Sequence, residues 1–155
     1  MVWNFMSNDP YNTLGLRNVS NTDRSDYNCG GYALETFSWY CPFKRYSYID
    51  LRTERDYKKI ERIAIKQMLK EIPGLKRISD KAIHDYNFDI EKYSVIAFRF
   101  SDCDFHFYKL GKNFCWYEKR GGNHKIYRHK YNEVWDNWGR HGEYNGKIYF
   151  FLKAR

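Results

Sequence analysis

The stretch Tyr27-Asn28-Cys29-Gly30-Gly31-Tyr32-Ala33-Leu34 is the part of the chain from which both the fold and the site are predicted. We expect a helix from Cys29 to about Tyr40, because Cys41 precedes Pro42 and a residue before proline disfavours helical angles. A cysteine at the start of a helix meets unpaired N–H groups and the positive end of the helix dipole, which favour the thiolate. The same pattern is also typical of a buried structural cysteine, so Cys29 becomes a candidate nucleophile only if a partner lies elsewhere in the chain.

Length and composition favour one domain that contains a sheet. The 155 residues are enough to bury a core, and the aromatic residues, 20% of the chain, pack well on a pleated surface. Lysine and arginine number 27 against 19 acidic residues, and the resulting net charge of +8 favours an anionic partner without identifying it. We expect one domain over residues 1–155, with an N-terminal strap (1–28), a mainly helical part (29–92) and an antiparallel sheet (93–155).

The cysteines and the N-terminal residues bear on cofactors and location. The four cysteines, at positions 29, 41, 103 and 115, form no C-x-x-C pair and no zinc spacing, so we expect neither a metal nor another cofactor. The first ten residues lack the basic and apolar runs of a signal peptide, and no apolar run is long enough to cross a bilayer. We therefore expect a cytoplasmic protein with reduced thiols, and delivery or release by another route stays open.

Two further helices are predicted before the sheet. The residues Thr53-Glu54-Arg55-Asp56 resemble a capping box, and they open an amphipathic pattern that reaches Ile72 and ends at Pro73-Gly74. The lysine-rich side of this helix is typical of a solvated face. A shorter helix is expected from Ser79 to Tyr86.

The chain from Tyr93 onward has the pattern of strands. Residues 94–100 and 104–110 read as consecutive strands, Gly111-Lys112-Asn113 as a turn, and residues 114–120 as the returning strand. With a three-residue loop, His106 faces Glu118 directly and their Cβ atoms are about 5 Å apart. The same face then carries Tyr108, Leu110, Phe114 and Trp116, an apolar patch that we expect to pack against the Cys29 helix. A two-residue loop would pair His106 with Tyr117 and separate the two polar side chains.

Three segments resemble a known family. They are N-C-G-G-Y-A-L (28–34), D-F-H-F-Y-K-L (104–110) and W-Y-E-K-R-G-G (116–122), and they look like the motifs of small papain-fold proteins of bacteria, phages and toxin modules, related to the NlpC-type thiol hydrolases. The resemblance covers residues 26–122, with a weaker similarity in a closing strand at 147–152. It implies an α+β, papain-like fold in which the catalytic cysteine begins a central helix that packs on an antiparallel β-sheet.

The resemblance also implies roles for individual residues. Cys29 becomes the nucleophile, His106 the base, and Glu118 the group that orients the base. The family often has histidine at the position of Glu118, but a carboxylate also holds an imidazole in one tautomer. Asn123 and His124 are alternatives for this third role. Such a protein cleaves an amide bond in a peptide or protein, for example in peptidoglycan or a host protein, and an acyltransferase or transamidase uses the same residues.

A catalytically silent binding protein is the alternative interpretation. Basic and aromatic residues interleave between His124 and Arg140, and such surfaces bind nucleic acid or another anionic polymer through phosphate contacts and stacking. A mobile-element inhibitor that blocks a nucleic acid or protein partner would use a surface of this kind. The same pattern is also typical of a solvated rim around core aromatics. The candidate surface consists of Trp116, Arg120, Lys125, Arg128, Trp135 and Trp138.

Overall fold

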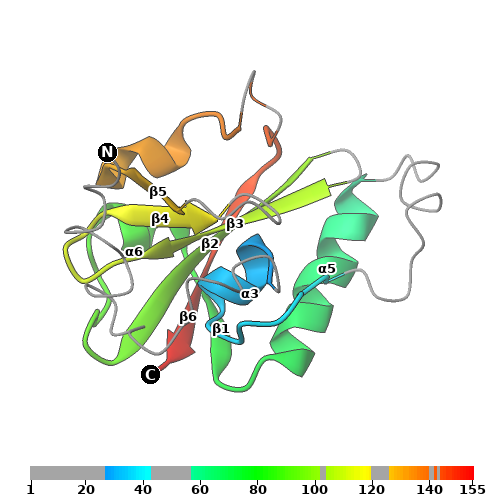
Figure 1. Ribbon diagram of the computed structural model, residues 1–155, viewed down its shortest axis with the longest axis horizontal. Coiled ribbons are helices and arrows are strands. Elements are labelled where there is room, and N and C mark those ends of the chain that lie inside the picture. Colours follow the sequence, from blue (N-terminus) through cyan, green and yellow to red (C-terminus); the bar gives the residue numbers. More distant parts are fainter. Residues whose placement is uncertain (1–26, 43–56, 102–103, 120–125, 140–141, 143) are drawn as a thin grey trace.

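A six-stranded antiparallel sheet forms the centre of the molecule (Figure 1). The computed structural model describes residues 27–42, 57–101, 104–119, 126–139, 142 and 144–155. The strand order is β1-β6-β2-β3-β4-β5, and every neighbouring pair is antiparallel. The strands are β1 (Leu75–Ile78), β2 (Tyr93–Ser101), β3 (Asp104–Leu110), β4 (Trp116–Lys119), β5 (Ile126–His129) and β6 (Ile148–Ala154). The helices are α3 (Cys29–Ala33), α5 (Tyr57–Glu71), α6 (Asp80–His84) and the 3₁₀ helix η2 (Tyr131–Trp135).

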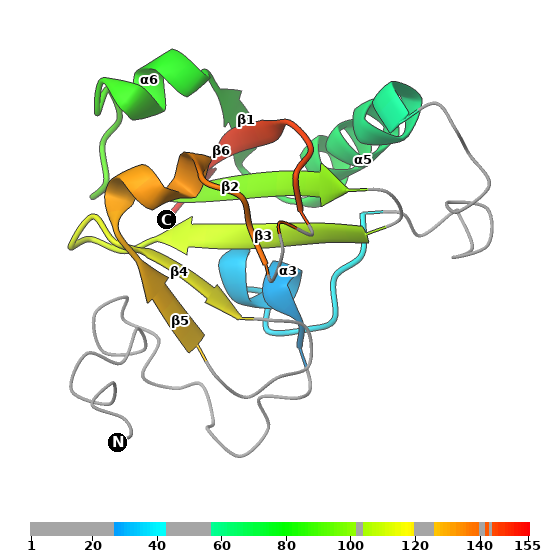
Figure 2. The ribbon, with the colours of Figure 1, turned by 90° about the horizontal axis from the view of Figure 1, so that it is seen from above.

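The expected papain-like fold with a central helix is wrong. Among the described residues strand predominates over helix, and the helix that begins at Cys29 has five residues and ends at Ala33 instead of Tyr40. It ends there because Glu35 and Phe37 adopt φ angles of 58° and 52°, and a right-handed helix cannot continue through that region. The short helix is packed at one side of an antiparallel sheet and does not run through the middle of the molecule (Figure 2).

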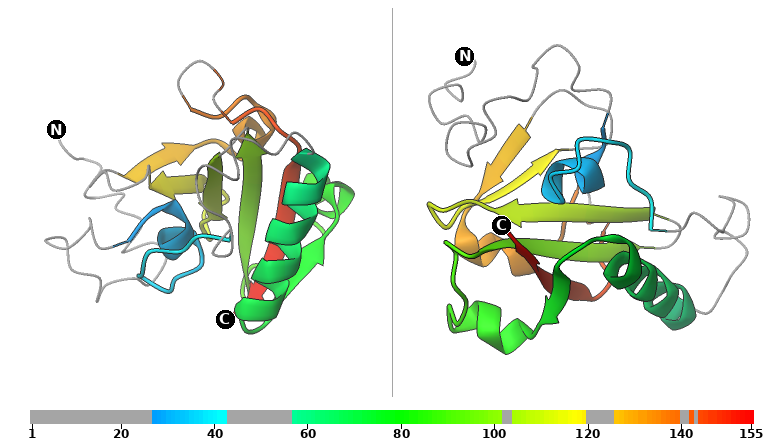
Figure 3. Two further views of the ribbon diagram at one scale, coloured as in Figure 1. Left: turned by 90° about the vertical axis from the view of Figure 1, so that its right-hand side faces the viewer. Right: turned by 90° about the horizontal axis from the view of Figure 1, so that it is seen from below.

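Apolar residues cover both faces of the sheet. On one face, α3 and α5 bury Leu34, Ile60 and Met68 against strand residues that include Phe98 and Phe107. On the other face, α6 and η2 contribute Ile83, Tyr131 and Val134 to a cluster rich in aromatic side chains. Figure 3 shows α5 running alongside the sheet. Of the candidate site residues described below, His106 and Glu118 come from strands between these two layers, and Cys29 comes from α3.

Most of the predicted elements are present, with differences at their ends. The strands β2, β3 and β6 correspond to the predicted strands at 94–100, 104–110 and 147–152. The predicted short helix at 79–86 is α6, and its N-cap Ser79 accepts a hydrogen bond from the Ala82 amide. The capping box at 53–56 lies outside the described residues. Two short strands were not predicted, and one of them, β1, lies inside the part expected to be mainly helical.

Candidate active site between the splayed strands β3 and β4

The register of the β3–β4 hairpin differs from the predicted one by two residues. Lys109 pairs with Tyr117 and Leu110 with Trp116, so residues 111–115 form a five-residue connection in which the Gly111 amide donates to the Cys115 carbonyl at 2.8 Å. Continuing this register places Glu118 level with Tyr108, two residues from the expected partner His106. Because side chains alternate with a period of two, a shift of two residues leaves Glu118 on the face of His106.

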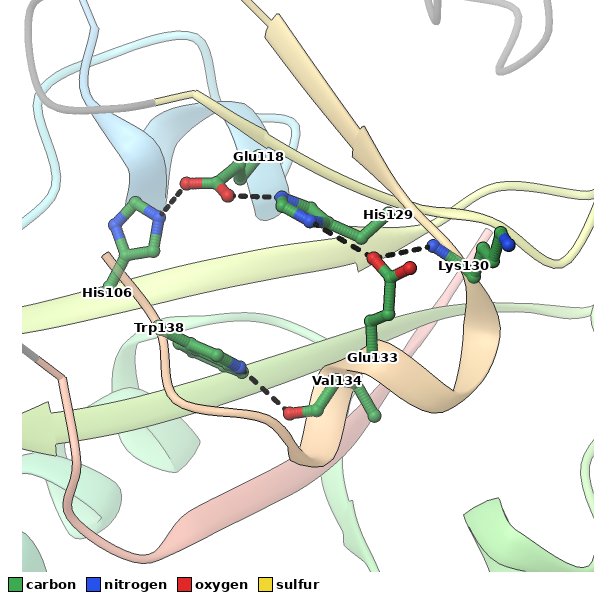
Figure 4. Close-up of polar contacts among 7 residues, drawn as sticks. All are labelled: His106, Glu118, His129, Lys130, Glu133, Val134 and Trp138. Carbon is green, nitrogen blue, oxygen red and sulfur yellow. Dashed lines mark hydrogen bonds and ion pairs between the residues drawn. The ribbon is translucent and has the colours of Figure 1, made fainter. Parts of the chain in front are cut away.

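His106 and Glu118 are therefore diagonal neighbours and still make contact. Nε2 of His106 lies 2.8 Å from Oε1 of Glu118, and the two residues are 3% and 1% exposed (Figure 4). A buried charge-assisted bond of this kind fixes the orientation of the imidazole ring. It also leaves Nδ1 as the ring nitrogen available to another partner.

That other partner is Cys29, at the start of α3. The apolar side of α3 packs against Phe107 and Tyr117, on the face opposite His106, so the expected packing of the cysteine helix on the His106 face is wrong. Figures 2 and 3 show β3 and β4 diverging from their hairpin with α3 in the angle between them. The Cys29 side chain interacts with the His106 ring through charge and hydrogen bonding.

The electrostatics of the His106 ring follow from these neighbours. Burial alone would lower the pKa of His106, because desolvation disfavours the charged ring. Charge and hydrogen bonding with Cys29, and then the hydrogen bond and charge of Glu118, outweigh this effect and raise the pKa to about 9. The imidazole is thus mainly protonated at neutral pH, with the Cys29 sulfur on one side and the Glu118 carboxylate on the other.

The backbone on which Cys29 stands is fixed by Asn28. Its side-chain oxygen accepts bonds from the amides of Gly31 (3.1 Å) and Tyr40 (3.0 Å), and its Nδ2 donates to the Tyr40 carbonyl at 2.8 Å. Asn28 therefore caps α3 and also fastens the segment that returns after it. The returning backbone lies so close that a Cβ on Gly31 would be 1.9 Å from the Ser38 carbonyl oxygen, which explains the glycine at this position.

Two buried lysines hold the two ends of α3. Nζ of Lys119 donates to the Tyr27 carbonyl at 2.6 Å, just before the helix, and lies 5.0 Å from the centre of the Tyr27 ring. Nζ of Lys109 contacts Glu35 at 3.4 Å, just after the helix, and lies 4.3 Å from the centre of the Tyr32 ring. These lysines belong to the strands that carry His106 and Glu118, but they project from the opposite face. The position of Cys29 is therefore tied to the strands that hold its partners.

A second histidine, which the sequence indicated only as part of the basic segment 124–140, binds the same carboxylate. Nε2 of His129 on β5 hydrogen-bonds Oε2 of Glu118, and its Nδ1 lies 3.6 Å from Oε2 of Glu133 on η2 (Figure 4). In the β4–β5 register His129 faces Trp116 and Glu118 faces Tyr127, so His129 is a diagonal neighbour of Glu118 on its second side. The run Ile126-Tyr127-Arg128-His129 has the residue types of a strand, and this was the available signal.

Aromatic rings surround the two histidines. Tyr144 stacks on His106 with ring centres 4.9 Å apart, and Tyr108 stacks on His129 at 5.0 Å. Trp138 stacks on the other side of Tyr108 at 4.0 Å and meets the edge of His106. The rings restrict the movement of both imidazoles.

The predicted binding surface is only partly available. Trp116 and Trp138 are 0% and 1% exposed, so the expectation that they form a surface is wrong: both belong to the core. Trp135 is half-buried and donates to Asp80 at 2.8 Å, whereas Arg128 is exposed. Four predicted residues lie outside the described part of the chain, namely Arg120, Asn123, His124 and Lys125.

Comparisons with known proteins give no family to which the site can be assigned. No protein-family model, no curated protein and no solved structure matches the chain. Within the described ranges, no group of three His, Cys, Asp or Glu side chains is arranged to hold a metal ion. In the same part of the chain, no helix has both the length and the apolar character needed to span a membrane. The chemistry must therefore be argued from the side chains themselves.

Proposed function

We propose that this protein is a cysteine hydrolase in which Cys29 is the nucleophile, His106 the general base and acid, and Glu118 the group that orients His106. The observation that carries the proposal is the His106 ring, which is bonded to Glu118 at 2.8 Å through Nε2 and also interacts with the Cys29 thiol. Thiol-dependent acyl transfer requires this arrangement, in which a nucleophile contacts a base and a third group orients the base. The motifs at 28–34 and 104–110, which resemble those of NlpC-type thiol hydrolases, give separate support.

The reaction has two stages. In the reactive state the proton of the Cys29 thiol lies on His106, in keeping with the protonated imidazole described above, and the thiolate sulfur attacks the carbonyl carbon of an amide. The imidazolium then gives the proton to the leaving amine as the C–N bond breaks, and the acyl group stays on sulfur as a thioester. Water attacks this thioester, His106 accepts a proton from the water, and the acid and the free thiol are released. A different acceptor in the second stage makes the same protein an acyltransferase.

The substrate class follows from this chemistry and from the charge of the chain. An amide in a peptide or protein, including the peptide part of peptidoglycan, suits a thiol nucleophile, and the net charge of +8 favours acidic substrates. We also propose a cytoplasmic location, where the Cys29 thiol stays reduced. Cys29 is 4% exposed, so neighbouring side chains must move to admit a substrate to the sulfur.

The test compares the reactivity of individual cysteines. Iodoacetamide alkylation is followed at each cysteine by mass spectrometry between about pH 5 and pH 9, in the wild type and in His106→Ala. Cys29 should react faster than Cys41 and Cys115 below pH 7, and it should lose that advantage in the variant. Brief exposure to p-nitrophenyl acetate should then leave an acetyl group on Cys29 in the wild type only. A Cys29 thiol that reacts only after unfolding contradicts the proposal.

The alternative of a catalytically silent binding protein has less support. It depends on a surface of basic and aromatic side chains, and two of the tryptophans expected there are in the core. A binding protein would show steeply salt-dependent association with nucleic acid that survives Cys29→Ala. A cysteine hydrolase loses its acylation in that variant.

A further inference from the structure

The carboxylate of Glu118 is shared between two histidines from the two neighbouring strands. Oε1 accepts from His106 of β3, and Oε2 is bonded to His129 of β5 (Figure 4). Glu118 is 1% exposed, so each oxygen depends on protein donors to balance the cost of burying its charge. The described structure thus directs one oxygen to each ring.

His129 is itself held on three sides. Its Nε2 meets Glu118, its Nδ1 lies 3.6 Å from Glu133, and its ring plane is 8° from that of Tyr108. Glu133 in turn accepts from the Lys130 amide at 3.3 Å. These contacts come from β3, β4 and η2, so the ring cannot turn without breaking interactions on several elements.

We propose that His129 is a positioning residue of the active site: it anchors Oε2 of Glu118 so that Oε1 stays directed at Nε2 of His106. This inference rests on the proposed function, since positioning matters for catalysis only if Cys29 and His106 react. Without the His129 donor, one of the bonds that hold the carboxylate group is lost, and the orientation of His106 is less tightly fixed. A buried carboxylate that had only to accept one bond from His106 would not need a second histidine set between two acidic groups.

Two substitutions separate hydrogen bonding from packing. His129→Phe keeps a ring that can stack on Tyr108 but removes both nitrogens, whereas His129→Gln loses the ring and keeps an N–H donor for Glu118. The matched control is His84→Phe, which changes a histidine whose side chain is 74% exposed on α6. All variants are full-length chains whose folded state is checked by circular dichroism before reactivity is measured.

Two readouts are recorded on each variant. Loss of one hydrogen bond to a charged group should slow alkylation of Cys29 about tenfold in His129→Phe, with little change in His129→Gln and none in His84→Phe. Proton NMR should show the Nε2–H resonance of His106, shifted downfield by its carboxylate partner, in the wild type and His129→Gln but not in His129→Phe. Equal slowing in both His129 variants would assign the effect to packing and overturn the proposal, and so would wild-type behaviour of His129→Phe.

The wild type alone provides an independent test. Its ¹⁵N-labelled histidines should show a protonated Nε2 on both His106 and His129 at neutral pH, because each nitrogen faces an oxygen of Glu118. An unprotonated Nε2 on His129 would overturn the inference even if no variant folds. Failure of the proposed function looks different: Cys29 would then be no more reactive than Cys41 in the wild type, whatever the state of His129.

Discussion

The free energy of unfolding should fall as the pH rises from 6.5 to about 9, because the folded protein holds a proton on His106 that the unfolded chain releases. Burial alone lowers the pKa of this imidazole, but Cys29 and Glu118 raise it to about 9 from the ordinary value of 6.5. A group with a raised pKa in the folded state stabilises that state fully below its unfolded pKa. The contribution is then lost as the pH passes through the folded pKa.

The size of the effect follows from the two pKa values. The difference between about 9 and 6.5, at 1.36 kcal/mol for each pKa unit, corresponds to about 3 kcal/mol. Lys109 acts in the opposite direction at higher pH: burial, opposed by Glu35, lowers its pKa from 10.5 to about 8. The cost of keeping this lysine charged in the folded state is relieved as the pH rises above 8. The change in the wild type alone therefore mixes two contributions of opposite sign.

A difference experiment isolates the histidine. Urea unfolding of the wild type and of His106→Gln is followed by tryptophan fluorescence at half-unit steps from about pH 6 to about pH 10. The stability advantage of the wild type should decline by about 3 kcal/mol across this range, because the contribution of Lys109 is common to both proteins and cancels. Cys29→Ala should reduce the slope, whereas the control Cys115→Ala should keep it. A difference that is constant with pH, or one that grows, would refute this account of the His106 environment.

Two predictions concern the segment that carries Cys29. Gly31→Ala should strongly destabilise the fold, because the new Cβ would lie 1.9 Å from the Ser38 carbonyl oxygen. In the control variant Gly30→Ala, the new Cβ would lie 3.2 Å or more from its nearest neighbours. A smaller loss of stability to urea in Gly31→Ala than in Gly30→Ala would contradict this prediction. Asn28→Ala should lower the free energy of unfolding by about 3 kcal/mol, because it removes three buried hydrogen bonds worth about 1 kcal/mol each, two of them to Tyr40. A loss well under about 1 kcal/mol in the same urea assay would show that the Asn28 cap does not hold this segment.

Local pattern was sufficient to predict the long strands and the capped helix. β2, β3 and β6 have continuous apolar or alternating patterns, and Ser79 signals the start of α6. The strands β1 and β5 have four residues each and lie at the two edges of the sheet, so they exist only through pairing with β6 and β4. Their formation depends on pairing partners, and although residues 126–129 have the residue types of a strand, no local pattern identifies those partners.

The error in fold class has a similar origin. The segment 29–40 has the residue types of a helix, but the bonds from Asn28 to Tyr40 fold the chain back and force Glu35 and Phe37 to positive φ. Hydrogen bonds between residues twelve positions apart thus outweigh helical propensity in this segment. The resemblance in the motifs described the start of the helix and its cysteine, but it did not determine how far the helix continues.

The contact between His106 and Glu118 was predicted although the register was not. The face that a side chain occupies depends only on whether the number of residues in the hairpin loop is odd or even. The predicted loop of three residues and the observed connection of five are both odd, so Glu118 stays on the same face. His129 had no such advantage, because its strand was not predicted. Its position beside Glu118 depends on the β4–β5 register, which the sequence does not reveal.

The buried charges around α3 support a functional origin for this arrangement. A helix of five residues is not stable alone, and here its two ends are fixed by Lys109 and Lys119, both 0% exposed. Burial lowers the pKa of Lys109 despite its contact with Glu35, so the charge is only partly compensated. Apolar side chains at these positions would be expected to give an equally stable or more stable core, since replacing buried ion pairs by packed hydrophobic residues is often neutral or stabilising. The lysines instead connect the helix of Cys29 to the strands of His106 and Glu118, which is what the proposed reaction between this thiol and its base requires.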